Sequence, residues 1–159
     1  MTEFEANNDV DVIACKYAKN VALMAFSYVK NIADAEDIMQ EVYLAMYEKK
    51  PSFESEEHLK AWLIRVAINK SKNHLKSFWH KKRETLHENF EACTEEENYV
   101  MEAMFSLKEK YRVPMHLHYY EGYSLEEIGK ILNANPSTVG TWLARGKEEL
   151  RKVLGGIDI

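Results

Sequence analysis

The chain has 159 residues and a formal net charge of -5 at pH 7, with 46% hydrophobic and 30% charged residues. This composition fits one ordinary folded domain or two small ones, and it excludes a disordered chain. Only 6 Gly and 3 Pro occur, so few tight turns are expected and helices are favoured. The negative total charge argues against a nucleic-acid binder, because such proteins usually carry a basic surface.

The charges are distributed unevenly along the chain. Residues 58–83 hold 8 Lys and Arg and no acidic residue, whereas residues 84–102 hold 7 acidic residues and no Lys or Arg. Such asymmetry predicts a nucleic-acid surface beside a charged linker. We therefore expect the acidic segment to join two helical units, although a direct electrostatic contact between the two segments is an alternative.

Several features indicate a cytoplasmic protein that is not an enzyme. Cys15 and Cys93 form no CxxC motif, which favours reduced thiols. No segment has the roughly 20 apolar residues of a membrane-spanning helix, and the acidic N-terminus is unlike a signal peptide. No Gly-rich phosphate loop, metal-ligand cluster or nucleophile–base set occurs, so we expect no metal, no cofactor and no membrane insertion.

The first part of the chain contains two predicted helices. Residues 9–30 carry apolar residues at steps of three and four, which predicts one helix. Asn31 interrupts this pattern, and Asp34 with Asp37 three residues later resembles a capping box. A second helix is therefore expected to begin at Asp34, and residues 49–51 (Lys-Lys-Pro) are expected to end it.

Acidic residues share one face of this second helix, away from its apolar stripe. They are Asp34, Asp37, Glu41 and Glu48, with Gln40 alongside. An acidic stripe is commonly just a solvated helix face. The functional alternative is a docking surface for a basic partner, since complementary charge steers and orients association.

A polar loop leads into a third predicted helix, whose expected N-cap is Ser55. One face of this helix is basic and polar, and its members recur at steps of four, three and four: Arg65, Asn69, Lys72 and Lys76. Such a stripe can follow the phosphates of a nucleic-acid strand, and Trp62 beside it can stack on an unpaired base. The alternative is that Trp62 belongs to the core and the lysines only solvate the helix.

The second half of the chain contains a helix-turn-helix pattern. Residues 124–127 (Ser-Leu-Glu-Glu) form a capping box at the start of a short helix, in which Gly129 is small where a partner helix must approach. Residues 133–135 predict a tight turn, and Asn135 followed by Pro136 predicts the next helix start. That helix would offer four side chains to the major groove: Ser137, Thr138, Thr141 and Arg145. A plain helical hairpin is the alternative.

Two residues bear on the helix before this motif. Gly122 is placed to cap its end. Pro114 predicts either a helix start or a kink.

Taken together, these segments resemble bacterial sigma factors of the extracytoplasmic-function (ECF) subfamily of the sigma-70 family. Four stretches carry the likeness in the family's order and spacing. They resemble the core-binding helix of region 2, the helix that engages the minus-10 promoter element, the first part of region 4 and its helix-turn-helix: residues 34–43, 59–69, 107–122 and 124–150.

The resemblance implies an all-α fold of two small helical domains joined by a flexible acidic linker. Region 2 would occupy residues 9–83, the linker 84–98, and region 4 residues 99–155. The implied function is that of an RNA polymerase sigma factor, which directs promoter-specific transcription initiation by binding core polymerase and by recognising and melting promoter DNA. The alternative is a stand-alone helix-turn-helix transcriptional regulator, which would bind DNA without polymerase.

The resemblance also implies a role for particular residues. The clamp helices of the largest polymerase subunit would be bound by Asp34, Asp37, Gln40 and Glu41. A flipped base of the non-template strand would enter the loop 51–57. Minus-10 DNA would be bound by Ser52, Phe53, Trp62, Arg65, Asn69, Lys72, Asn73 and Lys76. Minus-35 DNA would be bound by Ser137, Thr138, Thr141 and Arg145. An anti-sigma factor is the expected regulator.

Overall fold

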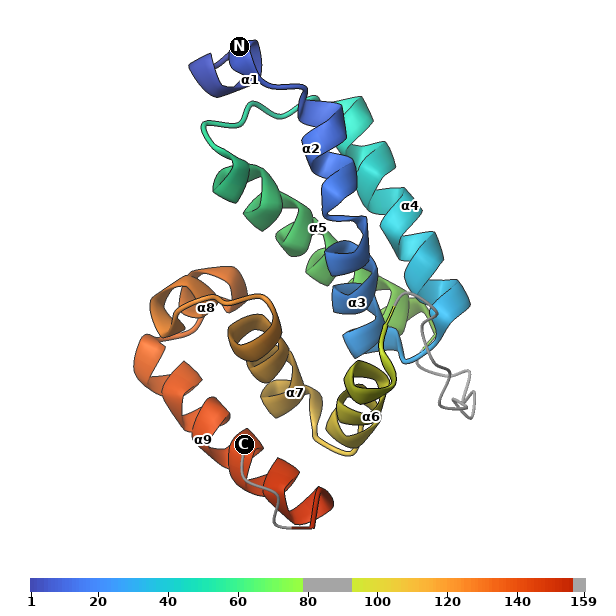
Figure 1. The fold of residues 1–159 in the computed structure, drawn as a ribbon, viewed down its shortest axis with the longest axis vertical. Coiled ribbons are helices and arrows are strands. Elements are labelled where there is room, and N and C mark those ends of the chain that lie inside the picture. The colour runs from blue at the N-terminus through green and yellow to red at the C-terminus, as the bar shows by residue number, and fades with distance from the viewer. Residues whose placement is uncertain (79–92, 156–159) are drawn as a thin grey trace. The chain divides into compact units, whose positions relative to one another are not determined.

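The computed structural model describes residues 1–78 and 93–155. Within these ranges every regular element is a helix, and the chain divides into two compact units, Met1–Glu88 (unit 1) and Asn89–Ile159 (unit 2) (Figure 1). This confirms the predicted all-α fold with two small helical domains.

Unit 1 is built around a helix that is buried on all sides. Its elements are α1 (Glu3–Asn7), α2 (Val10–Lys16), α3 (Ala18–Val29), α4 (Ile32–Lys49) and α5 (Glu56–Phe78). Every residue from Val21 to Val29 is buried, as expected for a helix without a polar face. This helix, α3, packs against both α4 and α5, which also contact one another (Figure 1). The core of unit 1 therefore lies between these three helices.

The single helix predicted over residues 9–30 is wrong, because the chain breaks at Tyr17 into α2 and α3. A contact distant in sequence accompanies the break. The Tyr17 hydroxyl donates to the Glu56 carboxylate, and the Lys16 Nζ lies 3.0 Å from the same oxygen. These two bonds lower the pKa of Glu56 and fix the break against the first turn of α5.

The predicted start of α4 at Asp34 is also wrong. Asn31 occupies the N-cap position, and its side-chain oxygen accepts a hydrogen bond of 2.9 Å from the Asp34 backbone N–H. Asn is among the preferred N-cap residues because its oxygen satisfies a donor that the helix leaves unpaired. Asp34 therefore lies in the first turn of α4. The predicted end is confirmed, since Lys49 is the last helical residue and Lys50 adopts a left-handed conformation.

Unit 2 contains α6 (Glu95–Met104), α7 (Glu109–Met115), the π-helical turn η1 (His116–Tyr120), α8 (Leu125–Leu132) and α9 (Pro136–Val153). Helix α9 packs against α6, α7 and α8. Pro114 lies inside α7, whose backbone widens directly afterwards into η1. Gly122 follows η1 with φ 79°, a left-handed conformation that suits glycine, so it stands at the predicted cap position.

The acidic linker is predicted over residues 84–98. Of these, residues 84–92 lie outside the described part of the chain, and residues 93–98 lie within it. Its last part begins a helix. Thr94 caps α6, and its side chain and that of Glu97 form a reciprocal capping box. Acidic residues in a first helical turn are stabilised by the helix dipole. The first helix of unit 2 thus begins inside the segment that the sequence predicts as linker.

Candidate functional site

The acidic stripe of α4 faces solvent along most of its length. Asp37, Gln40 and Glu41 are all exposed. Asp34 differs from them, because it is half-buried and its carboxylate oxygen lies 3.4 Å from the Nε2 atom of His74 on α5. Three of the four predicted docking residues are therefore free to meet a partner surface, and Asp34 is partly engaged within unit 1.

Two large apolar side chains extend this stripe toward the end of α4. Leu44 is 55% exposed and Tyr47 is 76% exposed. Since they follow Gln40 at steps of four and three, they lie on the same side of the helix. Sequence reasoning missed them, although both fall outside the apolar stripe that packs on α3 and α5. Exposed apolar groups rimmed by charge are typical of protein interfaces.

The polar stripe of α5 is also exposed. Arg65, Asn69, Lys72, Asn73 and Lys76 all face solvent. Helix α5 runs without interruption through these positions, so the side chains stand in a line along one side of it. The part of α5 from residue 58 onward carries no acidic residue, and the line is therefore positively charged.

Trp62 and Phe53 form the aromatic end of this stripe. Trp62 is half-buried on α5. Phe53 is only 1% exposed, and its ring stands edge-on to the rings of Trp62 and His58, with centroid distances of 5.9 and 5.6 Å. This differs from the predicted DNA contact of Phe53, because a ring buried in this way has no free face for a base. The Phe53 ring packs against the Trp62 ring instead.

The loop that carries Ser52 and Phe53 is bound by the N-terminal helix α1. The Glu5 carboxylate accepts hydrogen bonds from the Phe53 backbone N–H (3.2 Å) and the Ser52 hydroxyl (3.1 Å). It also accepts one of 2.7 Å from the Thr2 backbone N–H. The Thr2 bond above all, with those from Phe53 and Ser52, lowers the pKa of Glu5 to about 2. Sequence reasoning missed Thr2 and Glu5 entirely.

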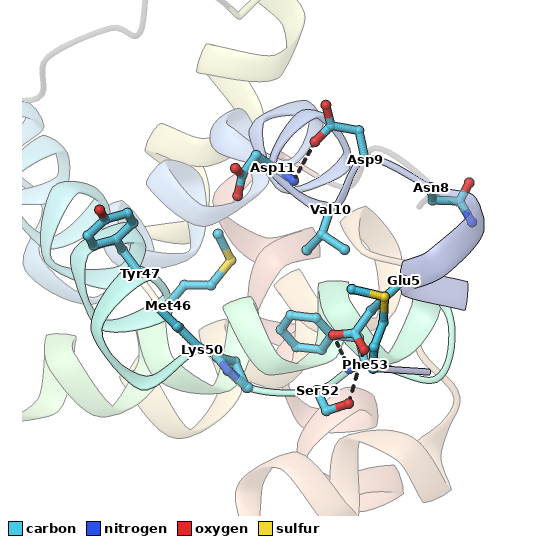
Figure 2. A pocket seen from close by; sticks show the side chains of 12 residues that line it. Glu5, Asn8, Asp9, Val10, Asp11, Met46, Tyr47, Lys50, Ser52 and Phe53 are labelled. Carbon is cyan, nitrogen blue, oxygen red and sulfur yellow. Dashed lines mark hydrogen bonds between the residues drawn. The ribbon is translucent and has the colours of Figure 1, made fainter. Parts of the chain in front are cut away.

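A hollow of about 510 Å³ opens beside this loop, between α1, α2 and the end of α4 (Figure 2). Its volume falls within the roughly 300–1,000 Å³ range of small-molecule sites. Glu5, Ser52 and Phe53 line one part of it, and Tyr47 and Lys50 line another. The hollow thus lies between the loop and the end of the α4 stripe.

The helix-turn-helix of unit 2 is built as its local signals predict. The Ser124 and Glu127 side chains form the capping box of α8, and Asn133 ends that helix in a left-handed conformation. The expected role of Gly129 needs correction. A Cβ atom at Gly129 would stand 2.5 Å from the Ala134 carbonyl oxygen, so the turn's own backbone, and not a partner helix, requires glycine there.

Helix α9 presents its predicted recognition residues to solvent. These are Ser137, Thr138, Thr141 and Arg145, and all are exposed. Two of them also contact unit 2 itself. The Thr141 hydroxyl donates to the Ser137 carbonyl at 3.2 Å, and a hydrogen bond from Arg145 lowers the pKa of the Tyr111 phenol on α7. Arg145 is therefore oriented by its neighbour before any DNA binds.

Two kinds of site are absent from the part of the chain that the structure describes. Residues 1–78 and 93–155 contain no group of three His, Cys, Asp or Glu side chains placed to hold a metal ion. In the same ranges, no helix has the length and apolar character needed to cross a membrane.

Comparisons with known proteins agree with this arrangement. Residues 15–81 match the family model for sigma-70 region 2, and residues 97–150 match that for sigma-70 region 4. The chain is 30% identical to the RNA polymerase sigma factor SigV of Bacillus subtilis, over 86% of this chain and 85% of SigV. It is 29% identical to the ECF RNA polymerase sigma factor SigW of the same organism, over 87% and 84% of the two chains.

A solved structure shares the fold. The sigma factor RpoE from Bartonella quintana, in a co-crystal structure with the anti-sigma factor NepR, aligns with a TM-score of 0.72 at 19% identity, over 89% of this chain and 93% of that chain. The family models cover both units, and the relatives span most of the chain. The chain therefore belongs to the extracytoplasmic-function subfamily of the sigma-70 family: it is an RNA polymerase sigma factor, a DNA-binding transcription initiation factor and not an enzyme.

Proposed function

We propose that the two units divide the work of a sigma factor between three surfaces. Helix α4 docks on core polymerase, α5 with the loop 51–57 holds the opened minus-10 strand, and α9 reads the minus-35 element. Residues 9–83 and 99–155 carry these activities. The observation that supports the proposal most is the line of exposed cationic and amide side chains on α5, which ends at a half-buried tryptophan.

The docking surface is formed by Asp37, Gln40 and Glu41, with Leu44 and Tyr47 at its end. Its partner is the pair of clamp helices of the largest polymerase subunit, as the family resemblance implies. Charge steers the encounter and fixes its register. Burial of the two apolar side chains adds affinity, at about 25 cal/mol per Å² of apolar surface removed from water.

The minus-10 surface binds a single strand, because the Watson–Crick edges of the bases are hidden within the duplex. Arg65, Lys72 and Lys76 neutralise phosphates along α5. Trp62 stacks on an unpaired base, which contributes about 1–3 kcal/mol. Asn69 and Asn73 bring amide groups that hydrogen-bond to base edges, and Ser52 lies exposed in the loop that receives the flipped base.

The minus-35 surface is much less basic. From Pro136 to Gly146 the only cationic residue of α9 is Arg145. Phosphate neutralisation supplies most of the affinity of non-specific DNA binding, so this helix binds duplex DNA weakly on its own. Unit 2 thus depends on polymerase to hold it at the promoter, which suits a factor that must ignore bulk DNA.

We further propose that this sigma factor acts in the cytoplasm together with polymerase, and that an anti-sigma factor regulates it. The sigma factor RpoE of similar fold was crystallised with an anti-sigma factor. The acidic and apolar face of α4 is a suitable surface for such a partner, because covering it would block polymerase docking directly.

Transcription with purified core polymerase on a library of genomic fragments tests the proposed function. With the protein added, we expect new transcripts whose start sites share one minus-10 and one minus-35 sequence upstream. With core polymerase alone we expect no such transcripts. The protein without polymerase should bind the same fragments at least tenfold more weakly. Tight binding by the protein alone, without new start sites, would contradict the proposal and favour a stand-alone regulator.

A further inference from the structure

Helix α1 is attached to unit 1 in an unusual way. It is five residues long and contributes no buried residue to the core. Hydrogen bonds join this helix and its N-cap residue Thr2 to Ser52 and Phe53, about fifty positions along the chain. The half-buried Phe4 and the polar contacts with this loop therefore hold α1 in place together.

These contacts engage both backbone polar groups of Phe53. The N–H donates to the Glu5 carboxylate, and the carbonyl accepts from the Thr2 hydroxyl. The hydroxyl of Ser52 donates to Glu5 as well (Figure 2). A loop residue held at both its donor and its acceptor has little freedom to rotate, since any new backbone conformation would leave these groups unpaired.

The fixed backbone has a consequence for the side chains on either side. It directs the Phe53 ring into unit 1, where it stands edge-on to Trp62. It leaves Ser52 and Glu54 exposed at the turn of the loop. The hydrogen bonds of α1 thus fix the conformation of the loop and, through the Phe53 ring, the position of Trp62 at the end of the α5 stripe.

We propose that Glu5 and Thr2 are positioning residues for promoter recognition: they hold the loop in the conformation that selects the flipped non-template base. This inference rests on the proposed role of the loop in minus-10 binding. Neither residue needs to touch DNA. Their effect is on selectivity at one base position, because a loop that samples several conformations accommodates several bases.

The chemistry of Glu5 makes the role specific to a carboxylate. Its two oxygens accept from the Thr2 and Phe53 N–H groups and from the Ser52 hydroxyl, and the Thr2 hydroxyl also lies 3.1 Å from one of them. Glutamine has one oxygen and replaces the other with an NH₂ donor, so Glu5→Gln must lose at least one of these bonds while keeping the size of the side chain. With its pKa lowered to about 2, Glu5 stays ionised at every pH used for transcription.

Glu3 offers a matched control. It lies in the same first turn of α1, is exposed, and makes no hydrogen bond to the loop within the described part of the chain. Glu3→Gln therefore makes the same change in charge and helix dipole without touching the loop. Thr2→Val is a second test variant that keeps the shape of the side chain. It removes the hydroxyl that donates to Phe53 and that also accepts from the Glu5 N–H as the N-cap of α1.

The experiment uses the full chain, assembled with core polymerase. The probe is fork DNA in which the unpaired positions of the non-template strand are randomised, and bound molecules are sequenced. For the wild type we expect strong enrichment of one base at one position. In Glu5→Gln and Thr2→Val that enrichment should fall about tenfold, while enrichment at other positions, affinity for core polymerase and melting temperature stay as in Glu3→Gln.

The possible outcomes separate this inference from the function on which it rests. If the wild type enriches no base, the proposed minus-10 role of unit 1 is wrong. If the wild type enriches a base and Glu5→Gln behaves like Glu3→Gln, the positioning role is overturned and the minus-10 role stands. If Glu5→Gln weakens all positions equally, α1 serves stability alone, and the positioning role is again overturned.

Discussion

The two helices proposed to bind DNA, α5 in unit 1 and α9 in unit 2, differ in chemistry. In unit 1, α5 exposes a line of cationic and amide groups, with Trp62 supported by the buried ring of Phe53. In unit 2, the first turns of α9 expose hydroxyl groups and one arginine, Arg145. Phosphate contacts supply affinity and base contacts supply specificity. This difference fits the proposal that unit 1 holds DNA by charge and stacking and that unit 2 contributes mainly to selection.

The units also differ in how they achieve their local geometry. Unit 1 uses polar side chains that reach across the sequence, such as Glu5 to the loop at 52–53 and Glu56 to Tyr17. Unit 2 uses glycines at close contacts, Gly129 against the Ala134 backbone and Gly146 against the Met115 side chain. Changes to charge should therefore affect unit 1 most, and changes to volume should affect unit 2 most.

The largest effect is expected from reversing the charge of the docking surface. Asp37→Arg with Glu41→Arg should lower the affinity for core polymerase at least a hundredfold, because placing like charges together costs several kcal/mol. Equilibrium binding to core polymerase measures this. Glu102→Arg with Glu148→Arg, both exposed in unit 2, makes the same change in net charge and should have little effect. Core affinity that survives the first pair would show that α4 is not the docking surface.

The next effect concerns Arg145 on α9. Arg145→Ala should cost about 1–3 kcal/mol of binding at a promoter with a minus-35 element, the usual contribution of an arginine that contacts a base. On a template without that element the variant should equal the wild type. Tyr111→Phe removes the phenol that orients Arg145 and should give a smaller loss. An equal loss of holoenzyme binding on both templates would mean that Arg145 contacts only phosphates.

A smaller effect is expected from volume added to unit 2. A Cβ atom at Gly146 would stand 2.5 Å from the Met115 sulfur. Gly146→Ala should therefore cost unit 2 about 1–3 kcal/mol through overpacking, less the same gain in helix propensity that applies at Gly140. Gly140→Ala is the control. Its Cβ would meet only a methyl of Leu125 at 3.3 Å, and the gain in helix propensity, up to about 1 kcal/mol, offsets that contact. Amide hydrogen exchange in α7 and α9 measures the stability of both variants. Equal protection of these amides in Gly146→Ala and Gly140→Ala would refute the packing explanation.

The smallest effect compares two N-cap residues. Asn31→Ala should lower the free energy of unfolding of unit 1 by about 1 kcal/mol, because the bond to the Asp34 N–H is lost. Asn135 stands at the N-cap of α9 without a side-chain capping bond, so Asn135→Ala should destabilise unit 2 by less. Urea denaturation of both variants tests this difference. A greater loss at Asn135 would contradict the assigned caps.

The helix-turn-helix could be predicted from the sequence because its signals are local. The capping box at Ser124 and the proline at the first position of α9 act within a few residues of one another. The stripes on α4 and α5 could be predicted for a related reason, since helical spacing alone places their members on one face.

Features that depend on distant residues could not be predicted. The break at Tyr17 accompanies a bond to Glu56, 39 positions away, and the loop is held by Glu5, 48 positions from Phe53. A five-residue helix such as α1 has no periodic pattern that would reveal it. The burial of Phe53 was missed because an aromatic residue in a polar loop has the same sequence signature whether its ring faces the core or the solvent.

Promoter melting tests the proposed division of labour most directly. Oxidation of unpaired thymines by permanganate reports melting of the minus-10 region by the wild-type holoenzyme. With Trp62→Ala and Asn69→Ala together, we predict at least a tenfold loss of this reactivity, since the stacking and amide contacts that hold the opened strand are removed. Affinity for core polymerase should stay within about twofold of the wild type, because neither residue belongs to the proposed docking surface on α4. Thymines that remain as reactive as with the wild type would contradict the assignment of strand opening to unit 1.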